Sequence, residues 1–197
     1  RVCLRALLDD LEPAGVRLVA MGDLTAEERQ AIDAHFESQI FPVLTPLAVD
    51  PGHPFPYVSN LSLSLAVEVR DPEIGSVHFA RVKVPQRLPR WVPVPGRGLQ
   101  FVPIEQVIGE NLHALFSGME VVGWHAFRVT RYSDLELTNL EDPDDLMASI
   151  EERVFERRFG EVARLEVQDA MPAHLRQLLL EELRDADHPG ANLLGAD

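Results

Sequence analysis

Apolar and mostly polar side chains alternate along residues 61–70. The apolar positions are Leu61, Leu63, Leu65, Val67 and Val69, and the intervening residues are Ser62, Ser64, Ala66, Glu68 and Arg70. A period of two residues is typical of a strand with one buried face. Residues 77–84 repeat the alternation less regularly, and residues 71–75 between them contain the proline and glycine of a turn. The pattern therefore predicts a β-hairpin over residues 61–84.

The segment that precedes this hairpin is rich in proline. Between residues 41 and 60 the prolines are Pro42, Pro46, Pro51, Pro54 and Pro56. Each proline fixes one backbone torsion and removes one amide donor, so we expect an ordered, irregular loop rather than a helix or a central strand. Ordered loops of this length often carry binding or interface residues, and a rigid connector is the simpler alternative.

Five stretches place apolar residues at helical spacing, namely residues 2–11, 25–40, 103–115, 142–160 and 172–183. Thr25 and Glu28 have the spacing of a capping box at the start of the second stretch. Pro103 and Pro172 lie where the first turn of a helix tolerates proline, and Gly15 and Gly118 follow helix ends. We predict a helix in each stretch.

Strands are predicted between these helices. Residues 16–20 and 165–167 are short apolar runs. Residues 121–131 form a longer one with Trp124 and Phe127 on opposite faces, which suggests a central strand with both faces covered. Residues 87–101, rich in proline and glycine, predict a loop with at most two short strands. The order of elements does not alternate strictly, so we predict an α+β fold with helices packed on a mixed, mostly antiparallel sheet.

Composition is that of an ordinary globular protein, with 197 residues, 46% apolar and 25% charged. This length suffices for one core with a short helical appendage. No apolar run approaches the ~20 residues needed to span a bilayer, and the N-terminal residues turn acidic too soon for a signal peptide. We expect a soluble, cytoplasmic protein. Cys3 is the only cysteine, which excludes an internal disulfide.

A net charge of −14 argues against binding to nucleic acid, because the average field repels polyanions. Motifs for catalysis are also missing. Gly96-Arg97-Gly98 lacks the third glycine of a phosphate loop, and the histidines do not pair with a second metal ligand or a nucleophile. We therefore predict no catalytic, cofactor-binding or metal residue in this chain.

The arginines leave one candidate site. Arg128 and Thr130 share one face of the predicted strand, Arg131 lies on the other, and Arg157 and Arg158 end the next predicted helix. Some of these could meet around an anion. The alternative is a salt-bridge network with nearby acidic residues, namely Asp134, Glu136, Glu151, Glu152 and Glu156.

Several motifs resemble a known family. They are Phe41-Pro-Val-Leu-Thr-Pro, the run from His53 to Leu65, Phe127-Arg-Val-Thr-Arg, Arg158-Phe-Gly and Asp169-Ala-Met-Pro. In this order they resemble bacterial polyphosphate kinase, the long-chain family that uses a phosphohistidine intermediate, from about Thr25 to Arg184. The resemblance implies the middle, or head, domain over residues 16–185. Residues 1–15 would end a helical N-terminal domain, and residues 186–197 would lead towards catalytic domains.

The resemblance also implies a function. The whole enzyme reversibly transfers the terminal phosphate of ATP to polyphosphate, using magnesium and a phosphohistidine in domains outside this chain. The head domain helps to hold a homo-oligomer and borders the passage to the active site, so the fragment alone is expected to be inactive. Its partners would be the other domains of the enzyme and polyphosphate. A cytoplasmic location is expected, with membrane association left open for the full enzyme.

Two groups of residues carry these expectations. Arg128 and Arg131 fall within a family motif and are candidates for contacts with polyphosphate or a partner domain. Phe55, Pro56 and Tyr57 are rigid and aromatic, a composition suited to an interface. The alternative is a free-standing α+β module that binds a protein or a small anion through the proline-rich loop.

Overall fold

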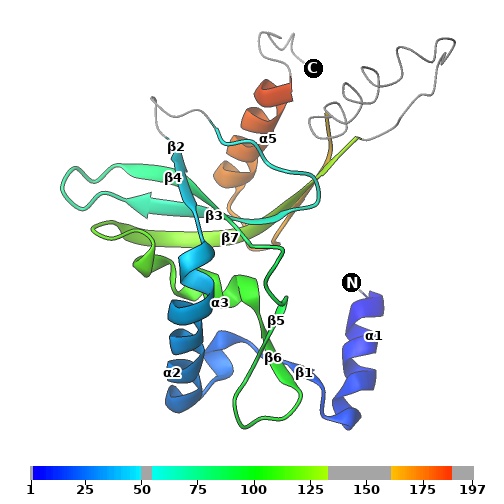
Figure 1. The fold of residues 1–197 in the computed structure, drawn as a ribbon. Coiled ribbons are helices and arrows are strands. Elements are labelled where there is room, and N and C mark those ends of the chain that lie inside the picture. The colour runs from blue at the N-terminus through cyan, green and yellow to red at the C-terminus, as the bar shows by residue number, and fades with distance from the viewer. Residues whose placement is uncertain (1, 50–54, 133–160, 188–197) are drawn as a thin grey trace, which may run out of the picture. The chain divides into compact units, whose positions relative to one another are not determined.

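The computed structural model describes residues 2–49, 55–132 and 161–187 (Figure 1). Two compact units share the chain: the first comprises Arg1–Asp50 and Leu65–Trp124, and the second Pro51–Ser64 and His125–Asp197. Helices accompany a mixed three-stranded sheet and a larger five-stranded sheet, which confirms the predicted α+β class. The predicted helix over residues 142–160 lies outside the described residues.

The first unit begins with two helices that follow the sequence pattern. Helix α1 spans Val2–Leu11, and Gly15 after it has a φ of 78°, a conformation that glycine adopts without strain. Helix α2 spans Ala26–His35, and both hydrogen bonds of the predicted capping box at Thr25 are present. The chain continues as a π-helical turn, Phe36–Ile40, which buries both of its terminal apolar side chains.

A small sheet in the first unit has the strand order β1-β6-β5. Strand β1 (Arg17–Leu18) pairs in parallel with β6 (Gln100–Pro103), and β6 pairs antiparallel with β5 (Trp91–Pro93). Strands β5 and β6 are the two short strands predicted within the proline- and glycine-rich segment. Positive φ values at Gly96 and Gly98 allow the tight turn between them.

The larger sheet has the strand order β2-β4-β3-β7-β8. Its strands are β2 (Pro46–Val49), β3 (Leu63–Arg70), β4 (Val77–Lys83), β7 (Glu120–Arg131) and β8 (Val162–Val167). Strand β2 pairs antiparallel with β4, and β7 pairs antiparallel with β8. Strands β3 and β7 each contribute residues to both units. This order confirms the predicted central position of β7. The expectation that both faces are covered is wrong, because Val122 and Arg128 on one face are exposed.

Two expectations for the proline-rich loop and the strand after it are wrong. Residues 46–49 are a strand rather than irregular loop, because β2 comes at the end of the strand order and Pro46 is its first residue, where a missing amide donor is tolerated. Strand β3 is buried on both faces from residue 64 to residue 67. Ser64 and Ala66 are small enough to be covered on the face that the alternation assigned to solvent.

Helix α3 spans Ile104–Glu110 and completes the core of the first unit. Pro103 precedes the helix as its N-cap, one position earlier than predicted, and the helix ends at Glu110 rather than near Leu115. Of the apolar stripe expected at helical spacing, Ile104, Ile108 and Leu112 are buried, whereas Leu115 is only half-buried. A Cβ atom at Gly109 would overlap the indole ring of Trp124. Glycine therefore allows the ring to pack directly against the helix backbone.

In the second unit, helix α5 spans Ala173–Asp187 and contacts strand β8. Leu175, Leu179 and Leu183 of this helix are buried, as its helical spacing predicts. The other buried apolar side chains of the unit include Val58, Phe127, Val129 and Met171. Phe127 and Val129 lie on one face of β7, so residues 128 and 130 project from the opposite face.

Candidate functional site

Strand β7 carries both arginines that the sequence singled out. Arg128 is directly opposite Glu166 of β8 in the strand register, and Thr130 is opposite Arg164. These four side chains share one face of the strand pair, since directly opposed residues of antiparallel strands project to the same side. Arg131 projects from the other face. The structure thus separates Arg128 from Arg131, as the predicted alternation requires.

Arg128 is held by a cross-strand ion pair on the exposed face. Its Nε atom donates a hydrogen bond of 2.8 Å to Oε2 of Glu166, and 48% of the arginine side chain is exposed. Arg164 lies on the other side of the same carboxylate, with Nη2 3.1 Å from Oε1. The hydrogen bond from Arg128 lowers the pKa of the Glu166 carboxyl group, and the same bond raises the pKa of Arg128. Both shifts favour the charged forms of Arg128 and Glu166.

Arg131 is buried, with only 3% of its surface exposed. Its Nε atom donates a 2.9 Å hydrogen bond to the carbonyl oxygen of Val58, and its guanidinium carbon lies 4.6 Å from the centre of the Tyr57 ring. Its backbone N–H donates to Oδ1 of Asn60 at 2.8 Å. Arg131 therefore fixes the last residues of the proline-rich segment to the end of β7.

The interface candidates lie at this same point of the chain. Phe55 and Pro56 are partly exposed, and Tyr57 is exposed although its ring contacts Arg131. Leu61, which is also exposed, has a φ of 57° and donates its backbone N–H to the carbonyl oxygen of Val129 at 2.8 Å. A leucine in this left-handed conformation is unusual, and the hydrogen bond to β7 stabilises it.

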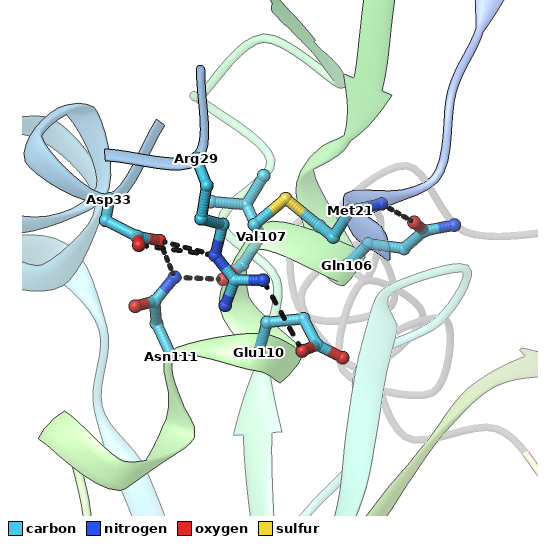
Figure 2. Close-up of polar contacts among 7 residues, drawn as sticks. All are labelled: Met21, Arg29, Asp33, Gln106, Val107, Glu110 and Asn111. Carbon is cyan, nitrogen blue, oxygen red and sulfur yellow. Dashed lines mark hydrogen bonds and ion pairs between the residues drawn. The ribbon is translucent and has the colours of Figure 1, made fainter. Parts of the chain in front are cut away.

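The first unit contains a second polar cluster, between helices α2 and α3 (Figure 2). Nε of Arg29 lies 3.2 Å from both carboxylate oxygens of Asp33, and Nη1 of Arg29 is 3.8 Å from Glu110. Nδ2 of Asn111 donates to Oδ1 of Asp33 and to the carbonyl oxygen of Val107, each at 3.0 Å. Because these groups satisfy one another, the cluster joins two helices and offers no reactive group.

Other arginines of the first unit also form ion pairs. Arg97, in the turn between β5 and β6, contacts Glu28 through Nε at 2.5 Å and Nη2 at 2.7 Å. Arg90 binds Glu105 at 2.6 Å and lies over the ring of Trp91. Arg81 is buried in β4, and burial lowers the pKa of its guanidinium group. Guanidinium groups thus link distant segments of this unit.

Over residues 2–49, 55–132 and 161–187, no group of three or more histidine, cysteine, aspartate or glutamate side chains could hold a metal ion. No helix in that part of the chain is long and apolar enough to cross a membrane. The predicted anion contacts Arg157 and Arg158 lie outside the described residues, as do the five acidic residues of the alternative salt-bridge network.

Sequence reasoning missed the partners of both β7 arginines. Val58 and Asn60 bind Arg131, and Glu166 and Arg164 surround Arg128. The two-residue spacing of Arg164 and Glu166, on either side of the apolar Leu165, could have placed them on one face of β8. Their position opposite Arg128 could not be found in this way, because the strand register depends on tertiary pairing.

Comparison with protein families gives one match that covers most of the chain. The profile of the polyphosphate kinase middle domain matches residues 27–188. Polyphosphate kinase from Thermosynechococcus vestitus is 50% identical over 187 residues, which cover 91% of this chain and 25% of that protein. Polyphosphate kinase from Mycobacterium tuberculosis strain H37Rv is 46% identical over 203 residues, covering 96% of this chain and 27% of that protein. The chain thus spans about a quarter of the length of these curated relatives.

A solved structure shares the fold. The crystal structure of polyphosphate kinase from Porphyromonas gingivalis matches with a TM-score of 0.67 and 21% sequence identity. The match covers 96% of this chain and 30% of that chain. At this level of identity the structural similarity supports the fold rather than any residue's role.

Proposed function

The chain belongs to the polyphosphate kinase family, whose middle domain it matches, and from this premise we propose that it serves as the non-catalytic middle domain of an ATP:polyphosphate phosphotransferase. The observation that carries the proposal is the match over residues 27–188 together with 50% identity to a named polyphosphate kinase. In the proposed reaction the terminal phosphate of ATP passes reversibly to the end of a polyphosphate chain, leaving ADP.

The chemistry of that reaction is assigned to other parts of a longer polypeptide. We propose that magnesium and ATP bind outside this chain, because the chain spans only about a quarter of the length of its relatives. We propose that residues 16–185 act by providing shape and contact surface, with residues 1–15 and 186–197 as connections to neighbouring domains. A cytoplasmic, homo-oligomeric enzyme is proposed on the same basis.

Arg128 remains the proposed contact for polyphosphate or a neighbouring domain, whereas the burial of Arg131 leaves that residue an indirect role. The exposed guanidinium of Arg128 supports direct contact with an anion. Arg131 is buried and bound to Val58, so its proposed contribution is to hold Tyr57 at the surface. Phe55, Pro56 and Tyr57 are proposed to contact another domain or a second subunit, which suits exposed aromatic residues on a fixed backbone.

The proposal is tested by comparing the full-length protein with the 197-residue chain. We expect the full-length protein to lengthen a polyphosphate primer when supplied with ATP and magnesium, and to form ATP from ADP and polyphosphate. The isolated chain should do neither. Polyphosphate synthesis by the isolated chain would refute a non-catalytic role, and a full-length protein without either activity would refute the assigned reaction.

The interface proposal has its own test. Replacing Tyr57 by serine in the full-length protein should shift the oligomer towards monomers in sedimentation velocity, because an exposed aromatic anchor is lost. Val77→Ser, which changes an exposed apolar residue of β4 in the other unit, serves as the matched control. An unchanged oligomeric state in Tyr57→Ser would contradict the proposed interface.

A further inference from the structure

A cationic cluster lies on the exposed side of the β7–β8 strand pair. We name it the β7–β8 polar face and define it by Arg128, Thr130, Arg164 and Glu166. It places two guanidinium groups around one carboxylate within a chain whose net charge is −14. The cluster is therefore a local exception to the acidic character of the protein.

Both arginines of the β7–β8 polar face keep N–H groups that do not bind Glu166. Arg128 uses only Nε towards Glu166, and Arg164 approaches the same carboxylate through one terminal nitrogen. A guanidinium carries five N–H groups. Within residues 2–49, 55–132 and 161–187, Nη1 and Nη2 of Arg128 have no other partner, and the Arg164 side chain is 69% exposed. Both arginines can therefore donate further hydrogen bonds to an anion in solvent.

Glu166 both orders these arginines and competes for them. Oε2 of Glu166 lies against the guanidinium of Arg128, and Oε1 lies against that of Arg164. The carboxylate therefore holds the two guanidinium groups on either side of itself. A ligand must compete with this carboxylate, which is present at the high effective concentration of a tethered group. An anion with a single charge gains no advantage over Glu166, whereas an anion with several charged groups can engage both arginines at once.

We propose that the β7–β8 polar face binds a linear polyphosphate, with Arg128 and Arg164 as its contacts and Glu166 as the carboxylate that the phosphate chain displaces. Thr130, which lies opposite Arg164, adds a hydroxyl group to the same face. The choice of a phosphate chain among multivalent anions rests on the proposed function, whereas the position of the site rests on the strand register and the ion pairs. Binding is non-covalent and sensitive to salt, because the face is exposed.

The test measures binding of medium-chain inorganic polyphosphate to the 197-residue chain in about 50 mM salt, a concentration at which exposed charges are weakly screened. Arg128→Gln and Arg164→Gln should each weaken binding about fivefold or more, because each removes a charge-assisted contact. Glu166→Gln should strengthen binding about two- to fivefold, the range expected when a competing surface ion pair is removed. Arg176→Gln, at an exposed position of α5, is the matched control and should change affinity less than about twofold.

Several results would overturn the site. The first is the absence of saturable binding by the wild-type chain. The second is an affinity for polyphosphate that is the same in both arginine variants as in the wild type. The third is a loss of affinity in Arg176→Gln as large as in Arg128→Gln and Arg164→Gln. Orthophosphate that competes as well as polyphosphate at equal phosphate concentration would overturn the assignment of a chain ligand. Unchanged circular dichroism in each variant would confirm that the fold is intact. Failure of binding, combined with normal polyphosphate synthesis by the full-length protein, would reject this site and leave the proposed function standing.

Discussion

Replacing Arg131 by methionine should destabilise the protein far more than the same change at Arg128. Methionine keeps an unbranched apolar stem but removes the guanidinium group. Arg131 is 3% exposed, and its Nε atom satisfies the buried carbonyl oxygen of Val58 at 2.9 Å. The backbone hydrogen bond from Arg131 to Asn60 does not involve the side chain and should survive.

The magnitude is worked from two of the side-chain contacts that are lost. A buried carbonyl that loses its partner costs about 1–3 kcal/mol. A cation over an aromatic ring contributes about 0.5–2 kcal/mol, depending on how far the pair is removed from water, and the Arg131 guanidinium lies 4.6 Å from the centre of the Tyr57 ring. We therefore expect the free energy of unfolding to fall by about 2–4 kcal/mol, a large part of the ~5–15 kcal/mol typical of a domain.

The assay is urea unfolding followed by circular dichroism, with Arg128→Met as the control. The control should cost less than about 1 kcal/mol, because Arg128 is half exposed and its ion pair is on the surface. Equal losses in the two variants, or a loss below about 0.5 kcal/mol for Arg131→Met, would refute the structural role of the buried arginine. A double-mutant cycle with Tyr57→Leu would isolate the contribution of the ring.

Three further predictions concern the first unit. Gly109→Ala should lower the unfolding free energy by about 1–2 kcal/mol, since overlap with the Trp124 ring outweighs the ~1 kcal/mol that alanine gains in a helix; calorimetry that finds higher stability would show that the ring yields easily. Glu28→Gln should lose stability relative to the wild type at pH 6, and this difference should shrink as the pH falls below 4.5. The hydrogen bond from Arg97 lowers the pKa of the Glu28 carboxyl group below 4.5, and the smaller effect of the bond from the backbone N–H of Thr25 has the same direction. The stability that the ionised carboxylate contributes is therefore present above pH 4.5 and is lost as the pH falls through the folded-state pKa. A loss in urea midpoint that does not depend on pH would contradict this assignment. Thr25→Ala should cost about 1 kcal/mol in urea unfolding by removing the helix cap, whereas Thr25→Ser should be nearly neutral, and equal costs would argue against the cap.

Features that depend on neighbouring residues were predicted correctly. The capping box at Thr25 and Glu28 and the buried stripe of helix α5 follow from helical spacing. The two short strands β5 and β6 also appeared where they were predicted. Membership of the polyphosphate kinase family, suggested by a few motifs, is confirmed by the match over residues 27–188. The capping box, the helical stripe and the two short strands depend on residues close together in the sequence, and the family membership depends on the order of several motifs along the chain.

Tertiary pairing decided the rest. The prolines alone argued against a strand over residues 46–49. These residues form strand β2 because they pair with β4 at the edge of the sheet. Arg131 binds Val58 across 73 positions of sequence, and Arg128 binds Glu166 across 38. The sequence by itself determined that Arg128 and Arg131 lie on opposite faces of one strand, because side chains alternate along any strand. Only the folded chain decided that one arginine is buried against a carbonyl group while the other faces solvent beside a carboxylate, since strand register and burial arise from contacts between distant segments.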